Sequence, residues 1–297
     1  MTDKDATKGI WLMIAAVSVF AAQDGFSRHL AETYNTFMVI MIRYWLFAGF
    51  VVLLAWRQPQ GFRSAIRTRH PWLHLLRAIL LITEVCAIVQ GYTLIGLINS
   101  HAIFAVCPLL VAGLAVPLLG EQIPWQRWAA IGAGLAGVLI ILQPGSGVFS
   151  LASLLPFAAA LMFAIYSLLT RLTTRDESGF VALFWSGIIG AVLISVIGLP
   201  NWQPMTGDDW LWMTVYALLA LLGNWLLIRC YEVAEASSVQ PFAYLQIVLV
   251  TLIGIVVYDE VLRTPVIIGG AIVVGAGLFA LLQTRRQAKG ILPQTPV

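Results

Sequence analysis

The chain has 297 residues, of which 60% are hydrophobic and only 10% are charged, and its net charge is +3. A soluble domain is about 45–50% apolar and about 25% charged, so this composition excludes an ordinary soluble enzyme, a disordered protein and a nucleic-acid binder. The apolar runs are continuous and about 20 residues long, the length of a bilayer-crossing helix, whereas a β-barrel shows ~10-residue alternating segments. We therefore predict an all-α integral membrane protein.

Ten apolar segments follow one another along the chain, and their connections leave no room for a soluble domain. The first segment lacks a small-x-small cleavage site, so we expect it to be kept as the first helix. The predicted transmembrane helices are residues 9–29, 36–56, 72–94, 98–119, 127–143, 151–171, 179–199, 209–232, 238–258 and 265–283.

The placement of Lys and Arg predicts the orientation of the chain. With a cytoplasmic N-terminus, 14 of the 17 basic residues fall on the cytoplasmic side. Arg28 and Arg263 fall on the other side, and Arg43 lies within a span. Cytoplasmic segments of membrane proteins carry such an excess of basic residues. We expect a multi-pass protein of the cell (inner) membrane with both termini in the cytoplasm, including a tail of residues 285–297.

An internal repeat relates the two halves of the chain. The stretch from Tyr92 to Glu121 matches the stretch from Tyr231 to Glu260 at an offset of 139, and upstream matches have an offset of 143. Each unit holds five helices, an odd number, so the second unit enters the membrane from the opposite side. Inverted repeats are the architecture of secondary transporters. The repeat predicts two five-helix units, residues 9–143 and 151–284, that exchange inward-open and outward-open states.

These features resemble the drug/metabolite transporter superfamily, and within it the ten-helix carriers built of two EamA domains. The residues that carry the resemblance are Leu119-Gly120-Glu121 before Ile131-Gly132, Asp259-Glu260 before Gly269-Gly270, Arg43 in the second span, and Gly91-Tyr92. The chain is most similar to YddG-type exporters of aromatic and other neutral amino acids. The resemblance implies export through a central cavity lined by helices 1–4 and 6–9, with helices 5 and 10 peripheral. The superfamily's phosphate-sugar carriers use intramembrane lysines, and this chain has none between Lys8 and Lys289.

Ionisable residues inside a bilayer are costly, so they usually face a partner or a cavity. Glu84 lies near mid-depth and is either a cavity carboxylate for a substrate ammonium or a proton, or a structural acid bonded to a neighbouring helix. Arg77 lies seven residues earlier, too far to pair directly with Glu84 without long side chains; it is a further gating or ion-pair candidate, with a charge that reaches the cytoplasmic interface as the alternative. Asp24 and Arg43 lie on consecutive helices, and we expect a structural or gating ion pair between them, with direct substrate contact as the alternative.

Polar and aromatic residues near mid-depth are the other candidates to line the cavity. The alternative for each is an interhelical hydrogen bond, worth about 0.6 kcal/mol on average in membranes. An aromatic wall suits an aromatic side chain, and charges of both signs suit a zwitterion. These candidates are Gln90, Tyr92, His101, Tyr166, Trp185, Asn224, Gln240, Tyr244 and Gln246.

Other motifs favour a carrier over an enzyme. Residues 132–137 match G-x-G-x-x-G, but no strand precedes them, so we expect packing glycines and no dinucleotide site. A rhomboid-like protease needs a Gly two residues before its Ser, which Ser186 lacks. We therefore predict no enzyme activity, no cofactor and no metal; the expected partners are a small-molecule substrate and the lipid bilayer, not nucleic acid. An exporter of lipophilic cations that uses Glu84 stays open as the alternative.

Overall fold

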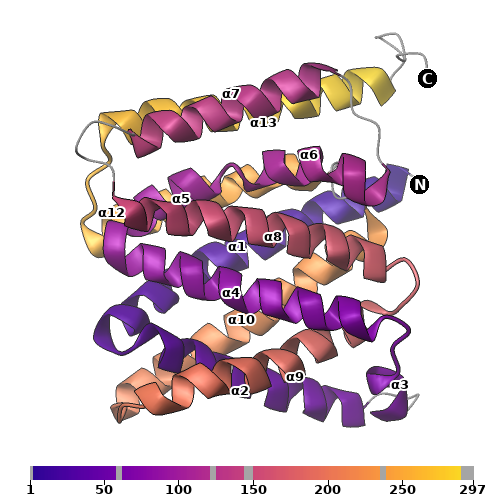
Figure 1. The fold of residues 1–297 in the computed structure, drawn as a ribbon, viewed down its shortest axis with the longest axis vertical. Coiled ribbons are helices and arrows are strands. Elements are labelled where there is room, and N and C mark those ends of the chain that lie inside the picture. Colours follow the sequence, from indigo (N-terminus) through magenta and orange to yellow (C-terminus); the bar gives the residue numbers. More distant parts are fainter. Residues whose placement is uncertain (1–2, 58–61, 121–124, 144–149, 235–238, 289–297) are drawn as a thin grey trace.

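The computed structural model describes residues 3–57, 62–120, 125–143, 150–234 and 239–288, and the regular structure in these ranges is entirely helical. Seven segments are long and apolar enough to cross a membrane, and three shorter apolar helices lie at 128–142, 242–258 and 264–279. The ten predicted spans and the all-α fold class are thereby confirmed. We call the face at which the first helix begins the N-terminal face (right-hand side of Figure 1) and the other the opposite face.

Five membrane spans make up the first half of the fold. A short helix, α3 (Phe62–Ile66), lies on the N-terminal face between the second and third spans. The spans are α1 (Asp3–Thr33), α2 (Thr36–Trp56), α4 (Pro71–Ile95), the pair α5 (Leu97–Phe104) and α6 (Cys107–Leu119), and α7 (Trp125–Leu142).

The second half repeats this order from the opposite face. Corresponding helices begin in the same way: Asn35 caps α2 by accepting from the Phe37 N–H, and Ser178 caps the seventh span by accepting from Phe180 N–H, 143 positions later. The spans are η1–α8 (Leu151–Ser153 and Leu154–Thr173), α9 (Gly179–Gly198) followed by η2 (Leu199–Asn201), α10 (Gly207–Val233), η3–α12 (Gln240–Tyr244 and Leu245–Tyr258), and α13 (Thr264–Ala288).

Two spans that the sequence predicts as continuous are broken. The fourth span is interrupted between α5 and α6 at Ala105 and Val106, and the ninth changes from a 3-10 turn to an α-helix at Tyr244 and Leu245. The two breaks are therefore 139 positions apart, which is the offset of the repeat. Pro108 stands in the first turn of α6, where the missing N–H costs least. Broken helices at corresponding positions of two halves mark the substrate site of many secondary transporters.

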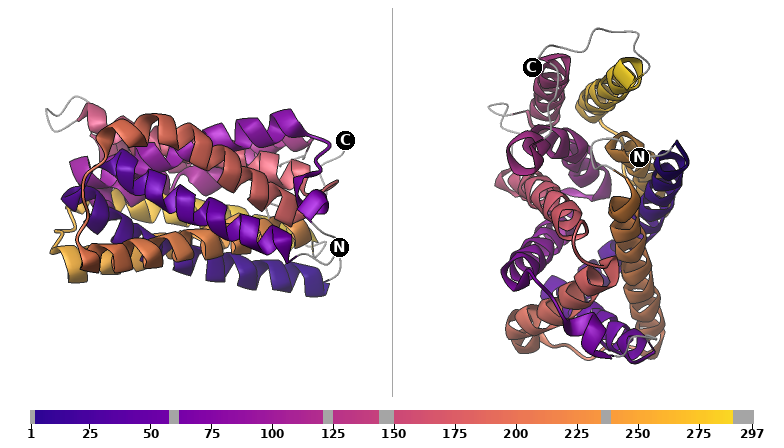
Figure 2. Two further views of the ribbon diagram at one scale, coloured as in Figure 1. Left: turned by 90° about the horizontal axis from the view of Figure 1, so that it is seen from below. Right: turned by 90° about the vertical axis from the view of Figure 1, so that its right-hand side faces the viewer.

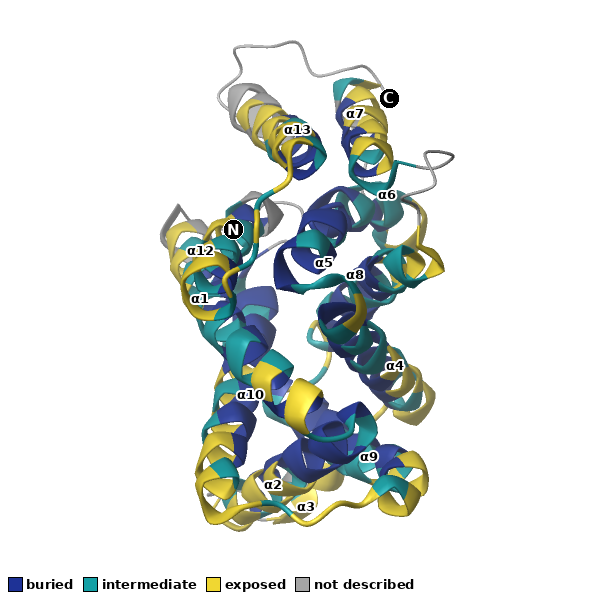
Figure 3. Cartoon of the chain, turned by 90° about the vertical axis from the view of Figure 1, so that its left-hand side faces the viewer, coloured by how far each residue is buried: buried dark blue, intermediate teal, exposed yellow. Residues whose placement is uncertain are grey.

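The helices pack in pairs that a two-fold axis would exchange. The contact of α1 with α10 is matched by that of α8 with α4, and the contact of α1 with α12 by that of α8 with α6. Viewed from the opposite face, α1, α10 and α12 form one column and α4, α5 and α8 the other, with buried residues between them (Figure 3). Each column mixes helices from both halves, so motion of one column against the other changes access to the space between them.

The fifth and tenth spans form a separate layer, as the resemblance implies. Helices α7 and α13 pack chiefly against each other at one edge of the molecule (Figures 1 and 2). A Cβ on Gly137 would collide with the backbone oxygen of Gly269, and a Cβ on Gly269 with that of Gly137. Gly134 and Gly137 of the G-x-G-x-x-G stretch thus permit close helix packing, as small residues do in membranes, whereas Gly132 faces open space.

Candidate functional site

Two cavities lie between the columns, next to the two helix breaks. The first, which we call the charged cavity, has a volume of about 60 Å³ and includes Asp24, Arg43 and Glu84 in its wall. The second, the apolar cavity, has a volume of about 40 Å³ and extends toward the N-terminal face along Met13 and Val17. The residues common to both are Phe20, His101, Phe104, Phe163 and Gln246.

Both cavities are too small for a bound metabolite in this conformation, because ligand pockets measure about 300–1,000 Å³. The common wall of three phenyl rings, one imidazole and one amide separates them. The Phe104 ring is part of this wall, and its centroid lies 6.0 Å from that of the His101 ring and 5.8 Å from that of the Phe163 ring. The structure therefore holds a contracted site with a charged and an apolar part.

A hydrogen-bonded cluster at the centre links Asp24 on α1 to three other helices. Nε2 of His101 lies 3.1 Å from Oδ2 of Asp24 and 2.9 Å from the hydroxyl of Tyr92, and the imidazole stacks on the Tyr92 ring. Gln246 donates from Nε2 to the same Asp24 oxygen at 3.0 Å. The cluster joins α1 and α12 of one column to α4 and α5 of the other, so its hydrogen bonds depend on the relative position of the two columns.

Arg43 projects to the other side of the charged cavity. Its Nη1 donates to the Tyr216 hydroxyl at 3.1 Å, and the same hydroxyl accepts from Ser27 at 3.2 Å. Asp24 and Arg43 both line the cavity, but in this conformation Asp24 contacts His101 and Gln246 while Arg43 donates to Tyr216, so the ion pair expected between them stays a prediction for another state of the cycle. Glu84 lines the same cavity and is 6% exposed.

The structure brings most of the candidate residues together at the cavities. Glu84, Tyr92, His101, Asn224 and Gln246 line the charged cavity with Asp24 and Arg43, and Tyr244 lines the apolar cavity. Four candidates contribute to neither: Gln90, Tyr166, Trp185 and Arg77. The side chain of Gln240 lies outside the described residues, as do the 289–297 part of the tail and Glu121.

The opposite face is closed by contacts between α1, α5 and the end of α12. Arg28 forms an ion pair with Glu260, whose carboxylate also accepts from the backbone N–H groups of Leu97 (2.6 Å) and Ile98 (2.8 Å) at the start of α5. Gly96 precedes them with φ 87°, and any Cβ there would meet the Glu260 carboxylate. At the same face the hydroxyl of Tyr34, which follows α1, donates to Asp209 of the neighbouring helix α10 at 2.5 Å.

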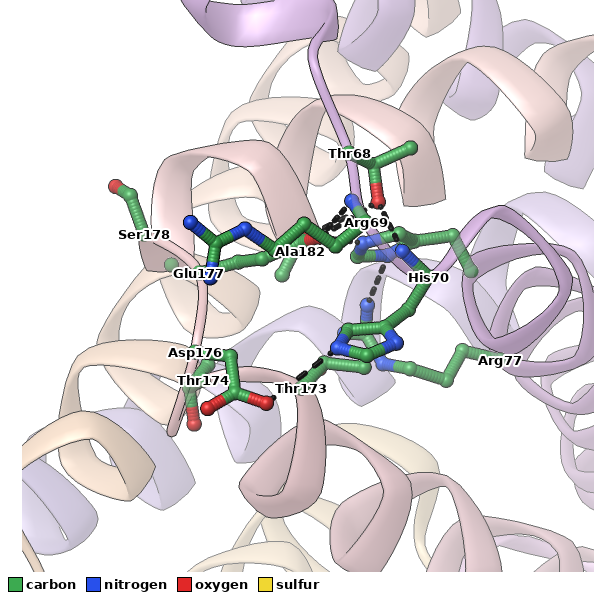
Figure 4. Close-up of polar contacts among 12 residues, drawn as sticks. Thr68, Arg69, His70, Arg77, Thr173, Thr174, Asp176, Glu177, Ser178 and Ala182 are labelled. Carbon is green, nitrogen blue, oxygen red and sulfur yellow. Dashed lines mark hydrogen bonds and ion pairs between the residues drawn. The ribbon is translucent and has the colours of Figure 1, made fainter.

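The N-terminal face is closed around Glu177, which follows α8 (Figure 4). Its carboxylate accepts from the Thr68 hydroxyl (2.8 Å), from the Arg69 N–H and from His74 Nε2 (2.8 Å). Arg77 Nη1 lies 3.0 Å from His74 Nδ1. Arginine only donates, so His74 accepts on Nδ1 and carries its proton on Nε2.

The electrostatic state of Glu177 follows from these contacts. Burial favours the neutral acid, but hydrogen bonds from His74, the Arg69 N–H and Thr68 outweigh it and hold the pKa of Glu177 below its ordinary value of 4.5. The sequence did not predict that Glu177, Tyr34 and Asp209 form hydrogen bonds between neighbouring helices at the two faces. The repeat contained a signal for two of them, because Tyr34 and Glu177 are 143 positions apart.

Inverted repeats, two corresponding helix breaks and a central cavity closed at both faces define a membrane carrier. The chain matches the EamA-like transporter family over residues 7–143 and 150–282, and it belongs to that family. It is therefore a transporter and not an enzyme, as the sequence predicts.

Relatives with known names cover nearly the whole chain. It is 28% identical to an S-adenosylmethionine uptake transporter of Rickettsia bellii (strain RML369-C), over 93% of this chain and 94% of that protein. It is also 28% identical to a riboflavin transporter of Vibrio cholerae, over 89% of each. A crystal structure with 19% identity has the same fold, with a TM-score of 0.69 over 97% of this chain and 99% of that one. Neither named relative is called an amino-acid exporter.

Proposed function

We propose that this carrier transports a small zwitterionic metabolite that has an amino-acid group at one end and a planar ring at the other. The observation that carries the proposal is the joint wall of the cavities: Arg43, Asp24 and Glu84 on one side, three phenyl rings between, and an apolar space beyond. Arg43 would bind the carboxylate, the two acids would bind cationic groups, and Phe104 and its neighbours would hold the ring.

The charges of the wall favour S-adenosylmethionine among the candidate substrates. The wall contains two carboxyl groups, those of Asp24 and Glu84, and one guanidinium, that of Arg43. S-adenosylmethionine has a carboxylate, an ammonium and a sulfonium, which is the complementary set. Aromatic amino acids supply the carboxylate, the ammonium and the ring without the second cation. Riboflavin is uncharged and leaves all three side chains without an ionic partner, which is costly in a membrane interior.

The transport cycle follows from the two closures. Release of the Glu177 contacts, which hold the start of α4 to the end of α8, would free α4 to move away from α8 at the N-terminal face, and release of Glu260 from Arg28 and α5 would open the other face. The excess of basic residues on the N-terminal face supports a cytoplasmic position for it in the inner membrane. The substrate gradient then sets the direction, so uptake and the export expected from the sequence are two directions of one cycle.

A lipophilic-cation exporter is the second candidate, and the carboxylates Asp24 and Glu84 favour it. Arg43 distinguishes the two functions. It would repel a cation that lacks a carboxylate, whereas it would bind a zwitterion.

The test is uptake into proteoliposomes of radiolabelled S-adenosylmethionine, L-tryptophan, riboflavin and tetraphenylphosphonium. We expect saturable uptake of the first two. We also expect Arg43→Gln and Glu84→Gln to reduce it at least tenfold, since hydrogen bonds to charged groups are worth about 1.5–3 kcal/mol. Arg229→Gln and Asp208→Asn, on exposed positions of α10, are the matched controls. Uptake of riboflavin or the phosphonium alone would refute the proposed substrate class and leave the carrier fold intact.

A further inference from the structure

The core contains two fully enclosed arginines without an acidic partner. Arg43 is 2% exposed and Arg77 is 0% exposed. No carboxylate in the described ranges forms an ion pair with either guanidinium. Each rests instead on tyrosine rings, Arg43 on Tyr216 at 5.3 Å and Arg77 on Tyr166 at 5.1 Å. Buried charges are normally paired, so both positions lack an anion.

Both guanidinium groups also keep an unused donor. Nε of Arg43 and Nη2 of Arg77 are buried without a hydrogen-bond partner. The other bonds of Arg77 go to neutral groups, from Nε to the Thr170 hydroxyl at 3.0 Å and from Nη1 to His74. An arginine fork binds carboxylates in a bidentate manner, and an arriving carboxylate would satisfy both the charge and the free donor.

The two arginines lie at matching depths from opposite faces. Arg43 is seven residues after Thr36, where α2 begins at the opposite face, and Arg77 is six residues after Pro71, where α4 begins at the N-terminal face. At a rise of 1.5 Å per residue these depths are about 10 Å and about 9 Å. Glu84 lies between them, seven residues beyond Arg77.

Arg77 lies on the same face of α4 as the residues that line the charged cavity. Leu81, Glu84, Val85 and Ile88 belong to the cavity wall, and Arg77 lies four residues before Leu81 on the same helical face. The closure that shuts this end runs from Arg77 through His74 to Glu177. Separation of α4 from Glu177 would extend the cavity by one helical turn and bring Arg77 to its wall.

We propose that Arg77 is a second binding station for the substrate carboxylate, occupied when the N-terminal face is open, as Arg43 is the station on the opposite side. The proposal rests on the proposed function, because it assumes a substrate with a carboxylate. The carboxylate would pass from one arginine to the other while Glu84, between them, holds the cationic group. A translocating anion then has a buried cation within reach on either side of Glu84, and in the empty protein each arginine is held by tyrosine rings and neutral hydrogen-bond acceptors.

The test compares the two faces of the full-length protein in proteoliposomes of known orientation. The probes are L-tryptophan and tryptamine, which is the same molecule without the carboxylate. Arg77→Gln should raise the half-saturation concentration of tryptophan at the N-terminal face about tenfold or more and change it less than twofold at the opposite face. Arg43→Gln should give the reverse pattern. Tryptamine, where carried, should be unaffected by Arg77→Gln.

Two further variants keep the result decisive. Thr170→Val removes a hydrogen bond of Arg77 but keeps its charge, and we expect it to leave the difference between the faces small. Arg77→Lys keeps the cation and loses the fork, and should give an intermediate effect at the N-terminal face only; it replaces Arg77→Gln if that variant does not fold.

An equal effect on both faces, an equal loss of tryptophan and tryptamine, or no effect would overturn the second station. These results leave the proposed function standing as long as the wild type carries tryptophan or S-adenosylmethionine. A wild type that carries neither of them refutes the proposed function itself, and the second station with it.

Discussion

The closure at the N-terminal face should be sensitive to a single change of Glu177 to Gln. The wild-type carboxylate accepts from three donors, and His74 cannot adapt to an amide. If the Gln NH₂ faces His74, it meets the Nε2–H of His74, so two hydrogen-bond donors point at each other. If the imidazole changes tautomer to avoid this, its Nδ1 carries a proton and points at the Nη1 donor of Arg77. If the amide turns over, its NH₂ meets the Arg69 N–H.

The magnitude follows from the lost charge-assisted bond. Such a bond contributes about 1.5–3 kcal/mol, which corresponds to an increase of about 10- to 150-fold in the population open at the N-terminal face. The assay is the labelling rate of Leu81→Cys by a membrane-impermeant maleimide added to that face, in a protein whose three native cysteines are replaced by alanine. Leu81 lines the charged cavity.

Asp176→Asn is the matched control. Its carboxylate lies beside Glu177 in sequence but contacts only the partly exposed His70, at 3.4 Å, and its side chain is 58% exposed. We expect it to leave the labelling rate within about twofold, because exposed ion pairs contribute little. Equal labelling rates for wild type and Glu177→Gln would refute the role of Glu177 in the closure.

Three further results are expected. The lowered pKa of Glu177 means that its contribution to the closed state is complete above pH 4.5 and is lost as the pH falls through the lower value. Labelling of Leu81→Cys, divided at each pH by the thiolate fraction of a freely exposed cysteine, should therefore stay level down to about pH 5 and rise only in stronger acid. Glu260→Gln should speed labelling of the same cysteine from the opposite face, because it removes the ion pair with Arg28; an unchanged rate would contradict that closure. Gly137→Leu should destabilise the protein by about 1–3 kcal/mol in thermal unfolding in detergent, whereas Gly132→Leu, which has open space around it, should not.

Much of the fold could be predicted because a bilayer imposes continuous apolar runs of fixed length. The repeat offset of 139 indicated the inverted arrangement, and the structure places both helix breaks at that offset. The breaks themselves were missed, since a proline such as Pro108 is compatible with the first turn of a helix and does not announce an interruption. The pattern of apolar residues indicates the length and polarity of a span, but it does not indicate a local change in backbone hydrogen bonding.

Part of the site could also be predicted, because the apolar bilayer makes charged residues within a span conspicuous. Asp24, Arg43 and Glu84 stand out because charges are rare inside spans, and all three line one cavity. Their pairing was not predictable, because the rotation of each helix about its axis is set by neighbours far along the chain, such as Tyr216 for Arg43. Glu177 was missed because charged residues are ordinary at helix ends.

The contact between α7 and α13 has a consequence for biosynthesis. The fifth span is synthesised well before α13, the helix that covers Gly137, because the whole second repeat up to α12 lies between them in the sequence. Until α13 is inserted, the glycine face of α7 lacks the partner against which it packs. Assembly of this layer therefore depends on α13, and a chain stopped after α12 would leave α7 without its main contact.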